Sequence, residues 1–177
     1  MQYNGFSVDL ESDGFVFESR NVWVMNLEDL ETGEKLQLHP FRDSTYKAKF
    51  LNWLDRYECP DVAFHNGLGF DVFVMFFVMD MDYSVGPDSL MGKRVNFVDT
   101  FYLSMYLNPD REKHSIEYFG KLLGFPKMDF RQACIDAGVI PKAAPDGAQF
   151  LQYSTIMDEY CDIDADIGAQ TYKHLLK

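Results

Sequence analysis

The order in which two hydrophobic periodicities alternate is the feature that most constrains the fold of this 177-residue chain. Apolar residues at every second position are typical of strands, and apolar residues three and four apart are typical of helices. Three strand-like runs come first, and helical and strand-like runs then follow in turn. This order predicts an α/β fold in which helices flank a mixed sheet. The expected strands are residues 5–11, 21–26, 35–39, 62–65 and 95–98, and the expected helices are residues 44–58, 70–79, 100–107, 115–123 and 154–176.

Local signals indicate where several of these elements begin and end. The turn-like residues 31–34 join the second and third strands as a hairpin. Ser44 and Ser115 are expected to cap the helices that follow them, and Gly124 is expected to end the second of these helices. Residues 70–79 are apolar almost throughout, so periodicity alone cannot separate a buried helix from a buried strand. Their length and glycine-rich entry favour a helix.

The composition fits a single domain spanning residues 1–177, because the chain contains no internal repeat, low-complexity tract or linker. No apolar run reaches the ~18–20 residues needed to cross a bilayer, and the N-terminal residues do not resemble a signal peptide. Cys59, Cys134 and Cys161 are odd in number and lack metal-ligand spacing, which is typical of reduced thiols. We therefore expect a cytoplasmic protein that has no membrane partner.

A net charge of −12 opposes nucleic-acid binding through phosphates alone, because release of counterions by basic side chains drives such binding. Most of the 28 acidic residues are expected to serve solubility. A nuclease can still be acidic if some acids hold cations and basic residues are placed locally. Seven of the 16 basic residues lie between positions 93 and 131 and permit a local phosphate-binding surface: Lys93, Arg94, Arg111, Lys113, Lys121, Lys127 and Arg131.

Two acidic residues stand on one side of the first expected strand. Side chains alternate across a strand, so Phe6, Val8 and Leu10 face one side while Asp9 and Glu11 face the other. Two carboxylates that are about 6.6–7 Å apart along a strand can share a hard cation through oxygen ligands. An exposed polar strand face would give the same pattern.

A second polar motif, His65-Asn66-Gly67-Leu68-Gly69-Phe70-Asp71, lies between a short strand and the apolar helix. Its two glycines suggest a tight turn or the close approach of a ligand. Asn66 offers both a donor and an acceptor to a sugar or phosphate. Asp71 lies at the N-terminal end of the helix, where an aspartate is also a common cap.

The last expected helix carries one carboxylate among its core positions. At about 100° per residue, Asp158, Asp162 and Asp166 share the outer face, as a solvated acidic stripe would. Asp164 falls on the inner face, where an unpaired charge is costly, so it needs either a cation or a Lys or Arg partner. Tyr160, four residues earlier, meets it on the same surface. The core positions on this face are Ile156, Met157, Tyr160, Ile163, Ile167 and Thr171.

Taken in this order, the three motifs resemble the three exonuclease motifs of the DnaQ-like, or DEDD, family. The resemblance extends from residue 5 to about residue 175. Tyr160 stands four residues before Asp164, and Glu159 replaces the histidine of the DEDDh branch, so the chain resembles the DEDDy branch. It is most similar to the proofreading domain of family A DNA polymerases from short-tailed bacteriophages. That similarity is carried by residues 64–67, 70–71, 98–100, 103–104, 115–117 and 123–124.

The resemblance implies a ribonuclease H-like fold, with a mixed five-stranded sheet whose second strand is antiparallel. It implies that Asp9, Glu11 and Asp164 bind one divalent ion. Asp9 would also help to bind a second ion, which Asp71 would hold mainly through water. Tyr160 would orient the attacking water or hydroxide. Mg²⁺ suits such an all-oxygen set, and Mn²⁺ is expected to substitute for it.

The resemblance also suggests which residues contact the substrate. Asn66, Leu10 and Phe70 are the candidates for seating the terminal nucleotide, and Phe15 is a further aromatic residue that could stack a frayed base. Asp99 is expected to cap a helix rather than to join the site. Residues 125–150 resemble no known pattern; partner contacts or a loop over the substrate are the two roles considered for them.

The implied activity is metal-dependent 3′→5′ hydrolysis of single-stranded or frayed DNA 3′ ends, with release of nucleoside monophosphates. The chain ends soon after the third motif, which fits an excised domain or a separately encoded exonuclease that acts beside a DNA polymerase. A natural-looking Met1 and a compact end favour the second. Trimming of RNA 3′ ends and a non-catalytic scaffold that keeps the fold are the alternatives.

Overall fold

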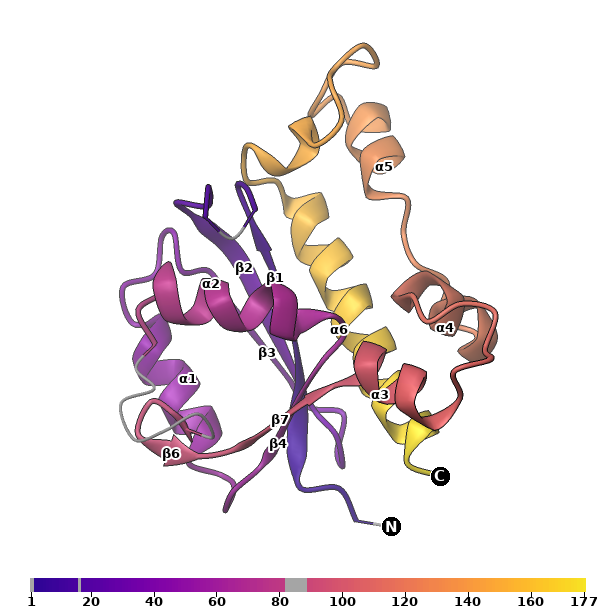
Figure 1. Cartoon of the computed structure of the whole chain (residues 1–177). Helices are drawn as coiled ribbons and strands as arrows, with labels where there is room; N and C mark the ends of the chain where they lie inside the picture. Colours follow the sequence, from indigo (N-terminus) through magenta and orange to yellow (C-terminus); the bar gives the residue numbers. More distant parts are fainter. Residues whose placement is uncertain (1, 16, 82–88) are drawn as a thin grey trace.

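The computed structural model describes residues 2–15, 17–81 and 89–177, and a mixed five-stranded sheet lies at its centre (Figure 1). The strand order is β3-β2-β1-β4-β7. Strand β2 is antiparallel to β1 and to β3, whereas β1, β4 and β7 are parallel to one another, so the expected sheet is confirmed. The strands are β1 Gly5–Ser12, β2 Val22–Asp29, β3 Lys35–Leu38, β4 Asp61–Phe64 and β7 Asn96–Asp99.

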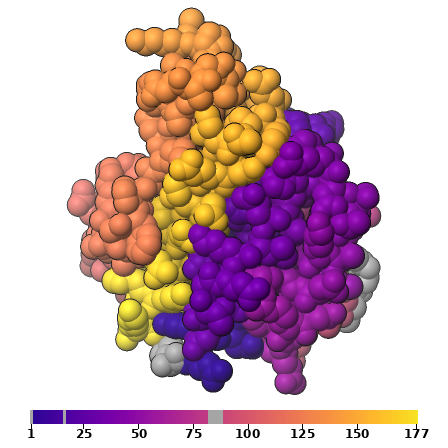
Figure 2. All heavy atoms as spheres, turned by 180° about the vertical axis from the view of Figure 1, so that it is seen from behind, coloured from indigo at the N-terminus to yellow at the C-terminus, as the bar shows by residue number. Residues whose placement is uncertain are grey.

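Helices cover both faces of this sheet. One face packs against α1 and α2, in a core that joins Phe6, Val8 and Leu10 of β1 to Phe50 of α1 and Met75 of α2. The other face is crossed by α6, which in turn packs against α3, α4 and α5 (Figures 1 and 2). The helices are α1 Tyr46–Leu54, α2 Asp71–Phe77, α3 Thr100–Leu107, α4 Ile116–Leu123, α5 Phe130–Asp136 and α6 Thr155–Leu175.

Several predicted boundaries are confirmed, but the predicted cap residue of α1 is wrong. The Ser115 hydroxyl accepts a hydrogen bond from the backbone of Tyr118 at the start of α4, and Gly124 ends that helix with a φ of 83°. Thr45, not Ser44, is the N-cap residue of α1, and it makes no side-chain cap. The Asp43 carboxylate two residues earlier accepts the backbone N–H of Thr45 instead.

Five short elements escaped the sequence patterns. They are α5, the 3₁₀ turns η1 Gly67–Gly69 and η2 Ala148–Phe150, and the hairpin of β5 Ser89–Leu90 and β6 Lys93–Arg94. Each is too short for a periodicity to be recognised over the usual window of about 11–18 residues. In the part of the chain that the structure describes, none of the helices has both the length and the apolar character required to span a bilayer.

The acidic stripe on α6 makes ion pairs as well as facing solvent, because residues in and just beyond β3 reach it. Lys35 of β3 forms ion pairs with both Asp162 and Asp166. His39, just beyond β3, lies 3.0 Å from the Asp158 carboxylate. These acids remain partly exposed to solvent, and they also join the helix to the sheet.

Glycines allow α6 to approach its neighbours closely. A Cβ atom added at Gly168 would lie 2.8 Å from the Ser7 hydroxyl of β1, so the helix backbone lies almost against the strand. Gly168 is one turn beyond Asp164, and Ser7 is two residues before Asp9. This contact therefore brings the α6 carboxylate next to that of β1.

We expect Gly120→Ala to destabilise the protein even though alanine favours helix by up to about 1 kcal/mol. The added Cβ would lie 2.5 Å from the backbone oxygen of Phe125 and 3.0 Å from Ile167 of α6. Overpacking of this kind costs about 1–3 kcal/mol, and each kcal/mol lowers the Tm by about 2–4 °C. Thermal unfolding would measure the loss. Gly69→Ala is the control, because an added Cβ there meets nothing within 4 Å.

Candidate active site

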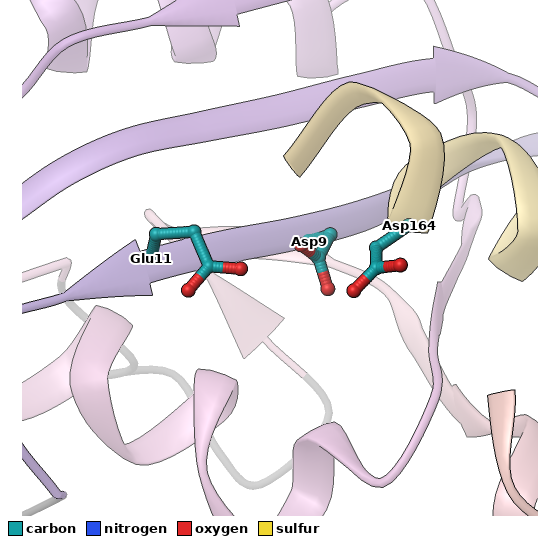
Figure 3. A group of neighbouring side chains, drawn as sticks. All are labelled: Asp9, Glu11 and Asp164. Carbon is teal, nitrogen blue, oxygen red and sulfur yellow. The ribbon is translucent and has the colours of Figure 1, made fainter. Parts of the chain in front are cut away.

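Three carboxylates converge where α6 crosses the central strand. Asp9 and Glu11 project from the same side of β1, and Asp164 reaches them from α6 (Figure 3). One oxygen from each group lies within 4.8 Å of the others. The predicted strand phase is confirmed, because Val8 and Leu10 are buried in the core while Asp9 and Glu11 are half-buried on the opposite face.

The electrostatics of this group call for a cation. Burial is the largest cause that raises the pKa of Asp9 well above its usual range, and the charges of Asp164 and Glu11 raise it further. Burial and the charge of Asp164 likewise raise the pKa of Glu11. Asp9 Oδ2 and Asp164 Oδ1 are buried without a hydrogen-bond partner among the described residues. Such orphaned hard oxygens fit a divalent cation such as Mg²⁺.

Asp71 lies at the start of α2, outside the group of three but electrostatically coupled to it. Burial raises its pKa to about 7, against the effect of backbone N–H donors from Asp71 itself and from Leu10. The N-cap residue of α2 is Phe70, so Asp71 does not occupy the cap position. A fourth carboxylate therefore faces the same region from a different element.

Tyr160 lies on α6 one turn before Asp164, as the helix phase predicts, and only 9% of it is exposed. Burial raises the pKa of Asp164, and hydrogen-bonding interactions with Lys127 and with the Tyr160 hydroxyl act against this shift. Burial is the main cause that raises the pKa of the phenol above its usual range, followed by the negative charge of Asp164. Tyr160 therefore stays protonated and acts as a hydrogen-bond donor rather than as a base.

Lys127 is a residue of the site that the motifs did not reveal. Its ammonium forms an ion pair with Asp164 Oδ2 and lies 4.6 Å from the centre of the Tyr160 ring. It arrives on the connection between α4 and α5, within the segment that matched no pattern. Two signals pointed toward it: the cluster of basic residues between 93 and 131, and the need of a buried Asp164 for a positive partner.

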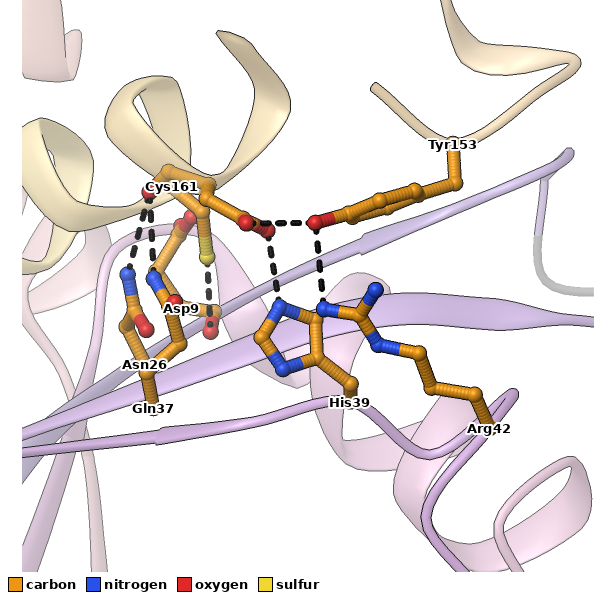
Figure 4. Close-up of polar contacts among 8 residues, drawn as sticks. Asp9, Asn26, Gln37, His39, Arg42, Tyr153 and Cys161 are labelled. Atoms are coloured by element: carbon orange, nitrogen blue, oxygen red, sulfur yellow. Dashed lines mark hydrogen bonds and ion pairs between the residues drawn. The ribbon is translucent and has the colours of Figure 1, made fainter. Parts of the chain in front are cut away.

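The first turns of α6 are held in place by polar contacts from three strands (Figure 4). The Asn26 and Gln37 amides donate to the backbone oxygen of Asp158. The Asp158 carboxylate accepts the Tyr153 hydroxyl at 2.6 Å. The Cys161 thiol donates to the backbone oxygen of Asp9 at 3.4 Å, so α6 is fixed to β1 directly behind the carboxylates.

The structure places the candidate substrate-contacting residues in different environments. Asn66 adopts a φ of 64°, and its backbone N–H donates to Asp99. Asp99 also caps α3 by accepting the N–H of Phe101, which confirms its predicted role. Leu10 is only 3% exposed, so it could meet a substrate only through its backbone. Phe70 packs partly against the core, and Phe15 is 79% exposed.

We expect the metal-free protein to lose stability as the pH rises from about 4 to about 7, and Asp71→Asn to reduce this loss. The folded protein holds a proton on Asp71 up to a pKa of about 7, whereas the unfolded chain releases it near 3.8. The folded state therefore binds more protons within this window, and its stability falls as the pH rises. Thermal unfolding in a chelator, at several pH values, measures the slope for both proteins. Equal slopes would contradict the expectation.

No protein-family model matches the chain, and no curated protein matches its sequence. Solved structures do match. NrnC from Brucella melitensis, in a structure with bound Mg²⁺, gives a TM-score of 0.56 at 15% identity, covering 99% of this chain and 73% of that chain. A structure described as the apo form of a nuclease gives 0.58 at 16% identity, covering 97% and 71%.

A chain from the structure of the yeast NOT1 MIF4G domain co-crystallized with CAF1 is also similar, with a TM-score of 0.52 at 12% identity. It covers 98% of this chain and 79% of that chain. At such low identities the likeness concerns the fold alone. Together with the sheet topology, it identifies an α/β fold of the ribonuclease H-like type, as expected.

Proposed function

We propose that this chain is a metal-dependent 3′→5′ exonuclease that hydrolyses DNA 3′ ends. The observation that carries the proposal is the convergence of Asp9, Glu11 and Asp164 within 4.8 Å, with the buried Tyr160 one helical turn before Asp164. The ribonuclease H-like fold supports it, and so does the similarity to a structure described as a nuclease and to NrnC with bound Mg²⁺. Resemblance to phage polymerase proofreading domains supports the DNA substrate and a role beside a separately encoded DNA polymerase.

Two divalent ions are proposed, Mg²⁺ in the first place with Mn²⁺ as a substitute. Asp9, Glu11 and Asp164 would hold one ion, and Asp9 with Asp71 would hold the other. When bound, the ions would relieve charge on the entering and leaving oxygens. The four carboxylates supply only hard oxygen ligands, which argues against zinc.

The reaction is a simple hydrolysis. A water oxygen forms a bond to the phosphorus of the terminal phosphodiester, and the bond from phosphorus to the 3′ oxygen of the preceding nucleotide breaks. That oxygen takes up a proton, and a nucleoside 5′-monophosphate leaves. Tyr160 would orient the water through its hydroxyl, while Asn66, Phe70 and the backbone of Leu10 would seat the terminal nucleotide.

The test is incubation of the protein with a 5′-labelled single-stranded DNA in Mg²⁺ and, separately, in a chelator. We expect a ladder of products that shorten from the 3′ end only when the metal is present. A phosphorothioate linkage at the 3′ end should slow the first cut. An intact oligonucleotide in both Mg²⁺ and Mn²⁺ would overturn the proposal and favour a non-catalytic scaffold. A matched RNA oligonucleotide separates DNA proofreading from RNA trimming, because the 2′-OH distinguishes them.

We expect Tyr160→Phe to lower kcat by about 10–100-fold, less than the loss of a metal ligand. The substitution removes the hydroxyl that would donate to Asp164 and accept a hydrogen bond from the attacking water, but it leaves every carboxylate in place. Single-turnover hydrolysis of the same labelled oligonucleotide measures the effect. A decrease as large as that of Asp164→Asn would contradict the orienting role and assign Tyr160 a greater one.

A further inference from the structure

The Tyr160 ring is held by residues from outside its own helix. Phe130 of α5 stacks on it, with ring centres 4.6 Å apart and planes at 15°. Phe150 of η2 meets the Tyr160 ring edge-on at 6.5 Å and contacts Phe130 at 5.2 Å. Together with Lys127, these aromatic groups surround the phenol, and all of them come from the segment between α4 and α6 that matched no sequence pattern.

The Phe130 ring is fixed independently of Tyr160. Phe130 is 4% exposed and begins α5, whose N-terminus is capped by the Asp129 carboxylate at 2.9 Å from the backbone of Gln132. The following loop is tied back to α5 by Arg131, whose guanidinium donates to two backbone oxygens of that loop. The backbone oxygen of Phe150 accepts the indole N–H of Trp23 from β2 at 2.8 Å. Phe130 therefore belongs to a segment that hydrogen bonds hold in place and connect to the sheet.

We propose that Phe130 is a positioning residue that holds the Tyr160 phenol on Asp164. This inference rests on the proposed function for its catalytic consequence. A tyrosine ring can rotate about its side-chain bonds, and one hydrogen bond to Asp164 does not fix the plane of the ring. Nearly parallel stacking on a rigid neighbour does fix that plane. Segment 127–150 thus serves the site by setting the orientation of its tyrosine.

Simple core packing is the competing explanation, since Phe130 also belongs to a cluster with Val24, Cys134 and Met157. The two explanations differ in what happens when the Tyr160 hydroxyl is absent. A positioning residue acts through that hydroxyl, so its loss matters only while the hydroxyl is present. A packing residue would lower activity by the same factor in either background.

The experiment is a double-mutant cycle with Phe130→Leu and Tyr160→Phe. We expect Phe130→Leu to lower kcat by about 3–10-fold with little change in KM, and to have almost no further effect in the Tyr160→Phe protein. Cys134→Ala is the matched control. Cys134 lies one turn along α5 in the same cluster, but it has no aromatic ring that could stack on Tyr160 as Phe130 does. An equal loss of kcat in both backgrounds would overturn the proposal.

A second measurement does not depend on nuclease activity. Aromatic NMR signals of Tyr160, assigned by their loss in Tyr160→Phe, report on the orientation of the ring. We expect them to shift or broaden in Phe130→Leu and to stay unchanged in Cys134→Ala. Unchanged signals in Phe130→Leu would reject the positioning role. If Phe130→Leu does not fold, Phe150→Leu takes its place with a smaller expected change, since its ring meets Tyr160 only edge-on. An inactive wild-type protein with the expected NMR changes would reject the proposed function alone.

Discussion

Replacing Asp9 with asparagine is expected to lower the rate of 3′ end hydrolysis by at least about 10³-fold, which corresponds to roughly 4 kcal/mol of transition-state stabilisation. Asp9 stands between Glu11 and Asp164 in the carboxylate group and is electrostatically coupled to Asp71. It is therefore the one residue proposed to serve both metal ions. Asparagine keeps its shape but removes the negative charge that holds them.

The fold should survive this change, because the metal-free site carries several carboxylates whose pKa values are raised by burial. Circular dichroism tests whether the fold survives. Single-turnover kinetics on the labelled oligonucleotide measure the loss of hydrolysis rate. Asp162→Asn is the matched control: it removes an acid two residues from Asp164 that pairs with Lys35 instead. We expect its activity to stay within about twofold of wild type, since surface ion pairs contribute only ~0–1 kcal/mol. Full activity in Asp9→Asn would contradict the proposed metal site.

Divalent ions are expected to stabilise the wild-type protein strongly and Asp9→Asn weakly. A ligand that binds only the folded state at 100 times its Kd adds about 2.7 kcal/mol of stability. For a chain of this length, that corresponds to a rise in Tm of about 5–11 °C. The rise should be larger at pH 8 than at pH 5, because protons compete for carboxylates whose pKa values are raised.

Thermal unfolding with increasing Mg²⁺ or Mn²⁺ measures this effect, with a chelator as the reference. The same titration on Asp9→Asn reports how much of the shift depends on the proposed site. An identical shift in both proteins would mean that the ions bind elsewhere. No shift in either protein would mean that the described carboxylates do not hold a metal in solution.

Periodicity found the residues that lie on long regular elements. Asp164 was separated from Asp162 and Asp166 because a helix of 21 residues fixes which side chains share a face. Asp9 and Glu11 share a side because neighbouring residues of β1 point to opposite faces of the sheet. The sheet topology followed the order of the elements and the family resemblance, and it was confirmed.

Contacts made by irregular segments left no comparable signal. Lys127 and Phe130 reach Tyr160 across 33 and 30 positions of sequence, and the seven-residue α5 is too short to show a clear amphipathic period. The pairing of Lys35 with the acids of α6 also depends on how the helix lies on the sheet, which the periodicity of one element does not describe. These contacts required the tertiary structure.

The ion pair between Lys127 and Asp164 has a consequence for how an acidic protein can hold a polyanion. With all four carboxylates ionised, the ammonium of Lys127 leaves the site with three negative charges. Two divalent ions would turn this surplus into a single positive charge, equal and opposite to that of one phosphodiester. Attraction for the backbone would then be strongest at the loaded catalytic centre, while the net charge of −12 on the chain favours release of the shortened strand.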